Sequence, residues 1–497
     1  MTIEETRNRI DIIDEKIAEL FQQRMEAVEQ IAQLKKDNDT AVKDANREKE
    51  IVEKHEPQIE DRWKPYYRRF MDDLFALSKD FQSDYIGRND SLIKKDADFS
   101  VFRVKAFDSS NAAKASAKLH EDTINGTVGS FCGEDGKLYI FNSVYEAFEK
   151  VPDIRKASYA SKIEGNDDYN DAVFSWVNRL NNIKAPHKCV AAPGGTGAIC
   201  LAVGNTIGKG DILLYPDIAW GSYKLMCAQF GGKAETYNLL DGDELSIKDI
   251  MAKCESVMER QHKIVLVIND PCQNPTGMSF KKEQWKQLMD FLIKMSEKGP
   301  VMLIDDIAYL DFCNDSEHCT SYMEYFNNMT DNMAVVITFS CSKSFTAYGM
   351  RLGDAIILSN NETQLDHLFN AFLRSARSWW SNVNNGFMDT VTEVIRHPES
   401  YLAEKKTAVK LLMKRADLFI RQAKECELPI YPYSDGFFVT IRVDDRDLLN
   451  RYTAKLEDDH VFCVPFTKGL RVALCGIPLA KVDGLAYRLK RVLDEVR

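Results

Sequence analysis

Glycine is missing from the first 86 residues of this 497-residue chain, and its first occurrence is Gly87. A stretch of this length without glycine favours long helices over tight turns. The spacing of its apolar residues predicts three helices, at about 2–36, 46–55 and 65–85, the last with Pro65 at a position that tolerates helix entry. We therefore expect residues 1–86 to form an all-α domain.

The pattern changes after a polar, charged segment at 87–100, which we interpret as a linker. Short apolar runs then alternate with helical patterns, and three of these runs are "KIVLVIND", "VMLIDD" and "MAVVITFS". Runs of this kind are typical of buried parallel strands. We expect residues 101–497 to form an α/β domain with a mostly parallel sheet.

Composition excludes several classes of protein. The net charge of −11 argues against a nucleic-acid partner, which requires a basic surface. The chain has no apolar run of about 18 residues, so we expect no membrane span, and its charged N-terminus does not resemble a signal peptide. The twelve cysteines are scattered without metal-ligand spacing, so we expect reduced thiols, no metal site and a cytoplasmic protein.

The first predicted helix has a cation within its apolar seam. Arg24 interrupts a seven-residue spacing, and Lys35 falls on nearly the same face because eleven residues make about three helical turns. A register-setting residue of a coiled coil or a snorkelling side chain would explain Arg24. A third explanation is a site for carboxylates, because an unpaired buried charge is costly. The apolar seam positions are Ile10, Ile13, Ile17, Leu20, Ala27, Ile31 and Leu34.

The segments "TRNRIDIIDEKIAELFQQRMEAVEQIAQLKK" and "VKDANREKEIVEK" resemble the all-helical chorismate mutase domain, and the resemblance covers essentially all of 1–86. It implies an intertwined homodimer that rearranges chorismate to prephenate. It also implies a site made of Arg7, Arg24, Lys35, Asp44, Arg47, Glu48, Ser78 and Gln82.

These residue types suit a pericyclic rearrangement, which needs neither a nucleophile nor a proton relay. The enzyme must clamp two carboxylates, a task that suits the arginine fork. It must also meet the charge that builds on the breaking ether oxygen, which suits Lys35 and Gln82. Arg7 lies roughly 100° from Arg24 around the helix, and the resemblance has it reach the partner's site.

The motif "SCSKSFTAYGMRLG" at 340–353 resembles the cofactor segment of class I aminotransferases, which use pyridoxal 5'-phosphate. The resemblance implies that Lys343 binds the cofactor covalently and that Ser340 and Arg351 hold its phosphate. Alone, a lysine between serines is usually a solvated side chain. Here, further motifs follow in the family's order.

These further motifs supply the remaining expected ligands of the cofactor and the substrate. Each has an ordinary structural explanation when taken alone, such as a glycine turn or a core tryptophan. The pattern aspartate, any residue, alanine, tyrosine selects Asp306 over its neighbour Asp305. The resemblance implies that the phosphate lies at a helix N-terminus formed by Gly194, Gly195 and Thr196. It implies that Trp220 stacks on the cofactor ring, that Asn274 and Tyr309 contact the phenolic oxygen and that Asp306 pairs with the pyridine nitrogen. It also implies that Arg471 binds the α-carboxylate of the substrate.

The family's architecture is a mostly parallel seven-stranded sheet, a smaller domain built from both chain ends, and a homodimer. The segment "RSWWSN" resembles one in aspartate and aromatic aminotransferases, which implies that Arg377 binds a substrate's side-chain carboxylate across the dimer interface. A surface arginine at a helix end is the alternative interpretation.

The two resemblances together predict a bifunctional enzyme of phenylalanine and tyrosine synthesis that acts on small molecules. The acceptor is prephenate, phenylpyruvate or 4-hydroxyphenylpyruvate, with glutamate or aspartate as donor, and plain aspartate–2-oxoglutarate exchange is a further possibility. A second hypothesis makes the helical domain a dimerisation or effector-binding module without turnover. A third gives the large domain decarboxylation or β-elimination chemistry.

Overall fold

The chain forms two units in the computed structural model, Met1–Phe107 and Asp108–Arg497. The structure describes residues 2–37, 45–86, 122–314 and 319–497. The predicted boundaries 1–86, 87–100 and 101–497 stay a prediction, because residues 87–121 lie outside the described ranges.

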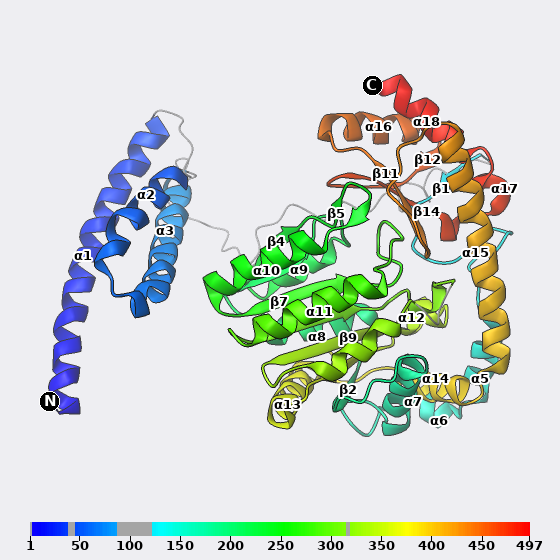
Figure 1. The fold of residues 1–497 in the computed structure, drawn as a ribbon, viewed down its shortest axis with the longest axis horizontal. Coiled ribbons are helices and arrows are strands. Elements are labelled where there is room, and N and C mark those ends of the chain that lie inside the picture. The colour runs from blue at the N-terminus through cyan, green and yellow to red at the C-terminus, as the bar shows by residue number, and fades with distance from the viewer. Residues whose placement is uncertain (1, 38–44, 87–121, 315–318) are drawn as a thin grey trace. The chain divides into compact units, whose positions relative to one another are not determined.

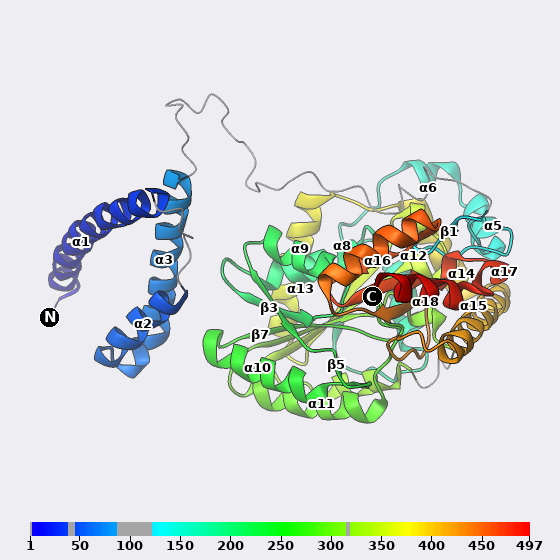
Figure 2. The same cartoon turned by 90° about the horizontal axis from the view of Figure 1, so that it is seen from above.

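The first unit consists of α1 (Ile3–Asp37), α2 (Ala45–His55) and α3 (Lys64–Ile86). All three predicted helices are confirmed to within one residue at each end. Two short 3-10 turns, η1 (Glu56–Gln58) and η2 (Asp61–Trp63), join α2 to α3. The helices α1 and α3 run in the same direction, as the hydrogen bonds from Arg24 to Ser78 and from Tyr85 to Gln33 require (Figure 2).

The predicted apolar seam of α1 is largely exposed within one chain. Ile10, Leu20 and Leu34 are 50%, 62% and 60% exposed. The buried positions are instead Val28 and Ala32, in the half of α1 that packs against α3. Most of the seam is therefore exposed in one chain.

The second unit is built on a seven-stranded sheet with the order β2-β10-β9-β8-β7-β3-β4. Strand β10 runs antiparallel to β2 and β9, and the remaining pairs are parallel. The predicted strands at 264–269, 301–306 and 333–340 are confirmed and fully buried, as apolar runs covered on both faces require. The bounds are β2 (His187–Ala192), β3 (Ile212–Pro216), β4 (Lys233–Tyr237), β7 (Ile264–Asn269), β8 (Val301–Asp306), β9 (Met333–Ser340) and β10 (Gly353–Leu358).

Helices cover both faces of this sheet (Figure 1). One apolar core lies under α8 (Gly194–Thr206), α9 (Ser222–Gln229) and α13 (Glu362–Trp379). The other face packs against α7 (Asp167–Asn178), α10 (Ile247–Gln261), α11 (Lys282–Ser296) and α14 (Asn385–Arg396). Shorter elements nearby are α5 (Asn142–Lys150), α6 (Asp153–Ala157), α12 (Cys341–Ser344), η3 (Leu310–Phe312), η4 (Ser321–Asn328), η5 (Tyr348–Met350) and the pair β5 (Leu240–Asp241) and β6 (Glu244–Leu245).

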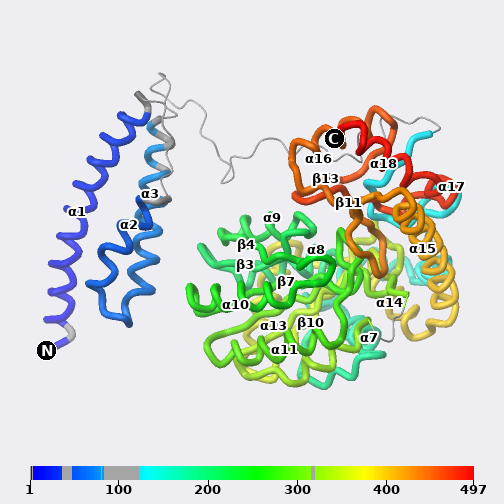
Figure 3. Tube along the Cα trace, turned by 45° about the horizontal axis from the view of Figure 1, so that its top comes forward, coloured from blue at the N-terminus to red at the C-terminus, as the bar shows by residue number. Residues whose placement is uncertain are grey.

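A smaller part with its own apolar core joins both ends of this unit (Figure 3). Its antiparallel sheet has the order β11-β14-β13, and β1 from the N-terminal side pairs in parallel with β12. The long helix α15 connects it to the larger sheet. The bounds are β1 (Ile124–Asn125), α15 (Glu399–Glu425), β11 (Phe438–Arg442), α16 (Arg446–Asp458), β12 (Val461–Phe462), β13 (Val464–Phe466), β14 (Gly469–Ala473), η6 (Leu474–Gly476), α17 (Leu479–Val482) and α18 (Leu485–Val496).

Candidate active sites

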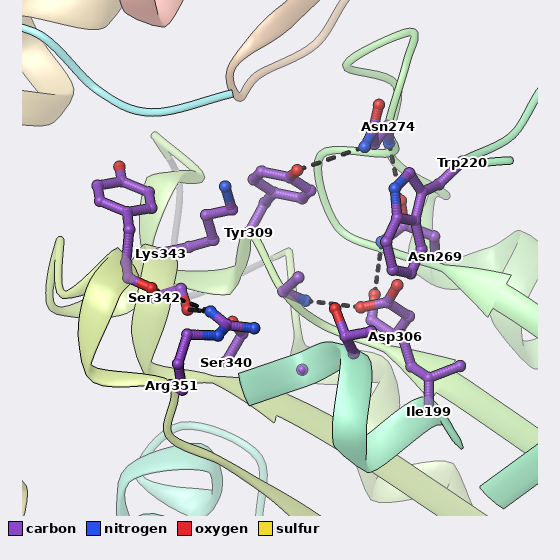
Figure 4. A pocket seen from close by; sticks show the side chains of 14 residues that line it. Ile199, Trp220, Asn269, Asn274, Asp306, Tyr309, Ser340, Ser342, Lys343 and Arg351 are labelled. Atoms are coloured by element: carbon purple, nitrogen blue, oxygen red, sulfur yellow. Dashed lines mark hydrogen bonds between the residues drawn. The ribbon is translucent and has the colours of Figure 1, made fainter. Parts of the chain in front are cut away.

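A cavity of about 200 Å³ lies where β7, β8 and β9 end (Figure 4). Asn269, Asp306 and Ser340 are the last residues of these three neighbouring parallel strands, so their side chains reach one edge of the sheet. The N-terminus of α8 borders the same cavity. Its lining comprises Gly195, Thr196, Ile199, Trp220, Asn269, Asn274, Asp306, Ala308, Tyr309, Ser340, Ser342, Lys343, Tyr348 and Arg351.

Lys343 projects its amine into this cavity from α12. Its Nζ donates a hydrogen bond of 2.5 Å to the carbonyl oxygen of Gly129, and lies 4.9 Å from the Tyr348 ring and 5.6 Å from the Tyr309 ring. Burial lowers the pKa of Lys343 to about 8, and the nearby Arg471 contributes in the same direction. The amine therefore loses its proton, and becomes nucleophilic, at a lower pH than an exposed lysine does.

The peptide segment around Gly129 holds several of these groups. It begins just after β1, and Arg471 Nη2 donates to the Thr127 carbonyl at 3.0 Å. The Phe131 N–H donates to the Tyr348 hydroxyl at 2.8 Å. This segment was not recognised in the sequence, because it carries no motif and reaches the site only through long-range pairing.

Asp306 supplies the carboxylate of the cavity. The Tyr223 hydroxyl donates to its Oδ2 at 2.5 Å, and the Ala308 N–H donates to its Oδ1 at 3.1 Å. Burial raises the pKa of Asp306 to about 6, and these two hydrogen bonds act against that rise. Trp220 also lines the cavity and packs edge-on against Tyr223, with ring centroids 5.5 Å apart.

The neighbouring Asp305 points to the other side of β8, as the alternation of side chains along a strand requires. Its Oδ2 accepts a hydrogen bond of 2.9 Å from the Tyr322 hydroxyl. Burial, followed by the nearby Asp270 carboxyl, raises the pKa of Asp305 well above its ordinary value. Asp306 is therefore the aspartate of this pair that faces the cavity.

One end of the cavity is shaped to hold a small anion. Arg351 has a left-handed backbone, with φ of 52°, and donates to Ser342 Oγ at 3.1 Å. Gly194 has φ of 76°, and a Cβ built there would lie 2.8 Å from Arg351 Nη2. A Cβ at Gly195 would lie 3.0 Å from Ser340 Cβ. The two glycines therefore let Arg351 and Ser340 approach the first turn of α8, whose N–H groups favour a phosphate.

Arg471 connects the smaller part of the unit to the other end of the cavity. Its Nη1 donates to Asn274 Oδ1 at 3.1 Å, and Asn274 Nδ2 donates to the Tyr309 hydroxyl at 3.4 Å. The guanidinium lies 4.3 Å from the centroid of the Phe438 ring, and its buried Nε has no hydrogen-bond partner among the described residues. Burial lowers the pKa of Arg471. An unsatisfied buried donor of this kind suits an incoming carboxylate.

Two neighbours of the site were missed at the sequence level. Asn269 donates to the Asp306 carbonyl at 2.7 Å, and its Oδ1 accepts from the Asn274 N–H at 2.7 Å. Tyr223 lies three residues after Trp220 at the start of α9, next to the residue that the motif identified. The sequence signal for Asn269 was its position at the end of an apolar strand, and the signal for Tyr223 was its position in the first turn of a helix.

Arg377 is not part of this cavity in one chain. It lies exposed in the last turn of α13, where its Nη1 donates to Ser381 Oγ at 2.7 Å. A role for Arg377 across a dimer interface stays a prediction.

In the helical unit, α1 and α3 bring three of the predicted mutase residues together. Arg24 Nη1 donates to Ser78 Oγ and lies 5.9 Å from the centroid of the Phe75 ring. Partial burial lowers the pKa of Arg24. Gln82 lies one turn beyond Ser78 and is buried, and its Oε1 has no hydrogen-bond partner among the described residues. Lys35 is half-buried on α1.

The remaining predicted mutase residues are dispersed. Glu48 on α2 forms an ion pair with Lys79 at 3.0 Å. Arg47 is exposed and contacts Glu50 at 3.2 Å. Arg7 is also exposed, and its position on α1 is roughly 25 Å from that of Arg24 at 1.5 Å per residue. Asp44 lies outside the described residues.

No group of three or more histidine, cysteine or acidic side chains within the described ranges is arranged to hold a metal ion. No helix in that part of the chain is long and apolar enough to cross a membrane.

A buried lysine, an anion cradle and a carboxylate at the edge of a mostly parallel sheet define a pyridoxal-phosphate-dependent transferase. Residues 121–489 match the family Aminotransferase class I and II, and residues 6–83 match Chorismate mutase type II. The chain belongs to the class I and II aminotransferases and carries a type II chorismate mutase domain before the aminotransferase domain. The fusion and the fold class expected from the sequence are confirmed, and the chain combines an isomerase with a transferase.

Several known proteins are similar to the aminotransferase region. The aspartate aminotransferase of Pseudomonas aeruginosa is 25% identical over 56% of this chain and 69% of its own length. The aromatic-amino-acid aminotransferase of the same organism is 29% identical over 38% of this chain and 46% of its own length. A crystal structure of an aminotransferase from Anaerococcus prevotii is 32% identical, has a TM-score of 0.73 and covers 76% of this chain and 93% of its own.

A more distant structure has the same fold. It is an aromatic-amino-acid aminotransferase from Burkholderia pseudomallei covalently bound to pyridoxal phosphate, 20% identical, with a TM-score of 0.63, covering 77% of this chain and 96% of its own. The cofactor of the family is pyridoxal 5'-phosphate, which this chain uses. The cavity fits that cofactor, because it combines an amine of lowered pKa, a cradle that side chains at 194 and 195 would fill, and a buried carboxylate.

Proposed function

We propose that the chain is a bifunctional enzyme of aromatic amino acid synthesis. Its helical domain converts chorismate to prephenate, and its large domain transaminates a 2-oxo acid. The observation that carries the proposal is the position of Lys343 in a cavity with a carboxylate and an anion cradle, within a chain whose partly buried Arg24 also contacts Ser78.

Bound pyridoxal phosphate supplies an electron sink that stabilises negative charge on the substrate Cα. When the cofactor is bound, Asp306 would keep the pyridine nitrogen protonated, and Asn274 and Tyr309 would hold the phenolic oxygen. Arg471 orients the substrate through its α-carboxylate. Lys343 Nζ, once free, moves the proton at Cα. Gly194, Gly195, Thr196, Ser340 and Arg351 would hold the phosphate, and Trp220 would stack on the ring.

The mutase site acts by clamping a dianion in a folded conformer. Arg24, next to Ser78, binds a carboxylate through its fork. Lys35 and Gln82 meet the charge on the ether oxygen. Arg7 serves the site of a partner subunit, and Asp44, Arg47 and Glu48 complete the pocket from the second helix and the residue before it.

The proposed acceptor is an aromatic-type 2-oxo acid: prephenate, phenylpyruvate or 4-hydroxyphenylpyruvate, with glutamate or aspartate as donor. The rings of Tyr309, Tyr348 and Phe437 around Lys343 support an acceptor with a ring. The protein is proposed to be a homodimer, which the exposed apolar seam of α1 supports, and to work in the cytoplasm, where its twelve free cysteines would stay reduced.

A coupled assay tests the proposal. Purified protein with pyridoxal phosphate and glutamate receives chorismate, and the products are followed by mass spectrometry over time. Arogenate that forms without earlier phenylpyruvate would establish both activities and identify prephenate as the acceptor. Prephenate that accumulates unchanged would support the mutase activity alone. The substrates of the large domain would then be one of the other 2-oxo acids or aspartate. Unchanged chorismate would contradict the bifunctional proposal.

A second candidate function makes the helical domain a dimerisation or effector-binding module, and the exposed seam on α1 favours it. The variant Arg24→Met separates the two. If the domain is a mutase, this variant loses at least about 100-fold in mutase turnover, because the buried carboxylate clamp is gone, while transamination is unchanged. Arg68→Met, which removes a cation paired with Glu56 in the same domain, is the control.

A further inference from the structure

An ion pair joins α2 to α3 beside the candidate mutase site. Lys79 Nζ lies 3.0 Å from Glu48 Oε1 and 3.1 Å from Glu48 Oε2, so it contacts both carboxylate oxygens. The two side chains are 32% and 28% exposed, which makes this pair more protected than the pairs within α2. No sequence motif pointed to Lys79.

The position of Lys79 connects this pair to the group that binds the ligand. Lys79 directly follows Ser78, whose hydroxyl accepts a hydrogen bond from Arg24. Successive helical residues are about 100° apart, so Ser78 faces α1 while Lys79 reaches α2. Two successive residues of α3 therefore each contact another helix: Ser78 contacts Arg24 on α1, and Lys79 contacts Glu48 on α2.

The proposed ligand is a dianion, and this gives the ion pair an electrostatic consequence. A carboxylate without a counter-charge beside two substrate carboxylates would repel them, because like charges raise each other's energy. Lys79 compensates the charge of Glu48 while it leaves the carboxylate as a hydrogen-bond acceptor. Because Lys79 contacts both oxygens, the Glu48 carboxylate has a fixed orientation in which it can accept a hydrogen bond from a ligand hydroxyl.

The second helix has few other anchors in one chain. Its half-buried apolar residues are Ile51 and Val52, and none of its side chains at 47–55 is fully buried. A helix of eleven residues has little stability alone. The ion pair with Lys79 is therefore well placed to set where Glu48 points.

We propose that Lys79 is a positioning residue of the mutase site, which orients Glu48 and offsets its charge so that a dicarboxylate with a hydroxyl group can bind. This role rests on the proposed mutase function. It goes beyond the eight site residues implied by the resemblance.

The test uses the full-length protein and mutase kinetics on chorismate. We expect Lys79→Met to raise KM about tenfold with kcat changed less than about threefold, because charge compensation acts on ligand binding as a whole. Lys79→Arg, which keeps the cation, should stay within about threefold of the wild type. In a Glu48→Gln background, Lys79→Met should change KM by less than about twofold, because the charge to be offset is gone. Lys49→Met, which breaks an exposed pair with Glu53 on α2, is the matched control.

The outcomes separate this role from the function it rests on. If the wild type turns chorismate over and Lys79→Met has the same kinetics, the proposed role of Lys79 is wrong but the mutase function stands. If Lys79→Arg raises KM as much as Lys79→Met does, Lys79 stabilises the fold in general rather than offsetting a charge. The same conclusion follows if Lys79→Met raises KM equally in the Glu48→Gln background. A wild type without any mutase turnover would overturn the proposed function and this role together. Transamination by each variant reports that the second unit is intact, and the circular dichroism of the helices reports on the first.

Discussion

At the residue scale, the transferase site depends on two groups whose burial changes their protonation. Lys343 loses its charge more easily than an exposed lysine, and Asp306 gains a proton more easily than an exposed aspartate. Both changes follow from desolvation of the charged form. Each produces a measurable dependence on pH.

The amine of Lys343 should react with an aldehyde at a lower pH than other lysines. Because its pKa is about 8, the neutral form increases as the pH rises through that value, well below the value of about 10.4 for an ordinary exposed lysine. Reductive methylation of cofactor-free protein with formaldehyde, read by peptide mass, measures this. Arg471→Met should move the midpoint upward, because Arg471 helps to lower the pKa of Lys343. A Lys343 peptide that reacts only together with the exposed lysines would contradict the prediction.

Tyr223→Phe should weaken cofactor binding at acidic pH. In its proposed role, Asp306 would pair with a protonated pyridine nitrogen only when it is ionised, so affinity should fall as the pH drops through its pKa of about 6. The Tyr223 hydroxyl stabilises the ionised form, and its removal therefore raises that pKa. An absorbance titration of pyridoxal phosphate from about pH 5 to about pH 8 should show the acid limb at higher pH in the variant. Coincident curves would contradict the proposed partnership.

At the element scale, a buried charge cluster around Asp311 joins three elements near Lys343. Asp311 in η3 accepts hydrogen bonds from Lys405 of α15 at 2.9 Å and from Arg179, at the end of α7, at 3.0 Å. Trp176 Nε1 donates to its other oxygen at 3.1 Å. Despite burial, these cations hold the pKa of Asp311 well below its ordinary value.

Asp311→Asn should destabilise the aminotransferase unit by about 3–5 kcal/mol at neutral pH, because it leaves two cations without their counter-charge. A folded-state pKa below the unfolded value gives stability that is present above the unfolded pKa and is lost as the pH falls. The difference between variant and wild type should therefore shrink in acid. Urea unfolding at several pH values measures this. Adding Lys405→Met to Asp311→Asn should recover part of the loss, and no recovery would argue against the cluster.

At the scale of the whole molecule, the exposed seam of α1 predicts how the mutase depends on association. Ile13 and Ile17 are 48% and 47% exposed. In the proposed homodimer they are buried, and a charge at either position would oppose the contact.

Ile13→Glu combined with Ile17→Glu should make mutase activity per mole fall on dilution, while the wild type stays constant over the same range. Transamination should be unchanged at every concentration. Gln22→Glu adds a charge at another exposed position of α1 and serves as the control. Mutase activity that is independent of concentration in the double variant would contradict the role of the seam.

The sequence predicted those parts of the fold and site that depend on local pattern. Asp306 and Ser340 were found because each ends an apolar strand or begins a recognisable motif, and parallel strands bring such ends together. Gly129 was not, because the chain reaches the cavity there through the pairing of β1 with β12, which joins residues more than three hundred positions apart. The seven-residue spacing predicted the apolar seam of α1, but a spacing alone does not say which chain covers Ile10 and Leu34, and both are exposed within this one.

The hydrogen bond from Lys343 to Gly129 has a practical consequence for anyone who recombines these domains. Gly129 lies just after β1, the first described strand of the second unit, so the first described residues of that unit supply the hydrogen-bond acceptor of Lys343. A graft that joined a foreign domain between Ile124 and Phe131 would keep every catalytic motif and still lose the backbone acceptor of the lysine. Successful chimeras should therefore be spliced before Ile124.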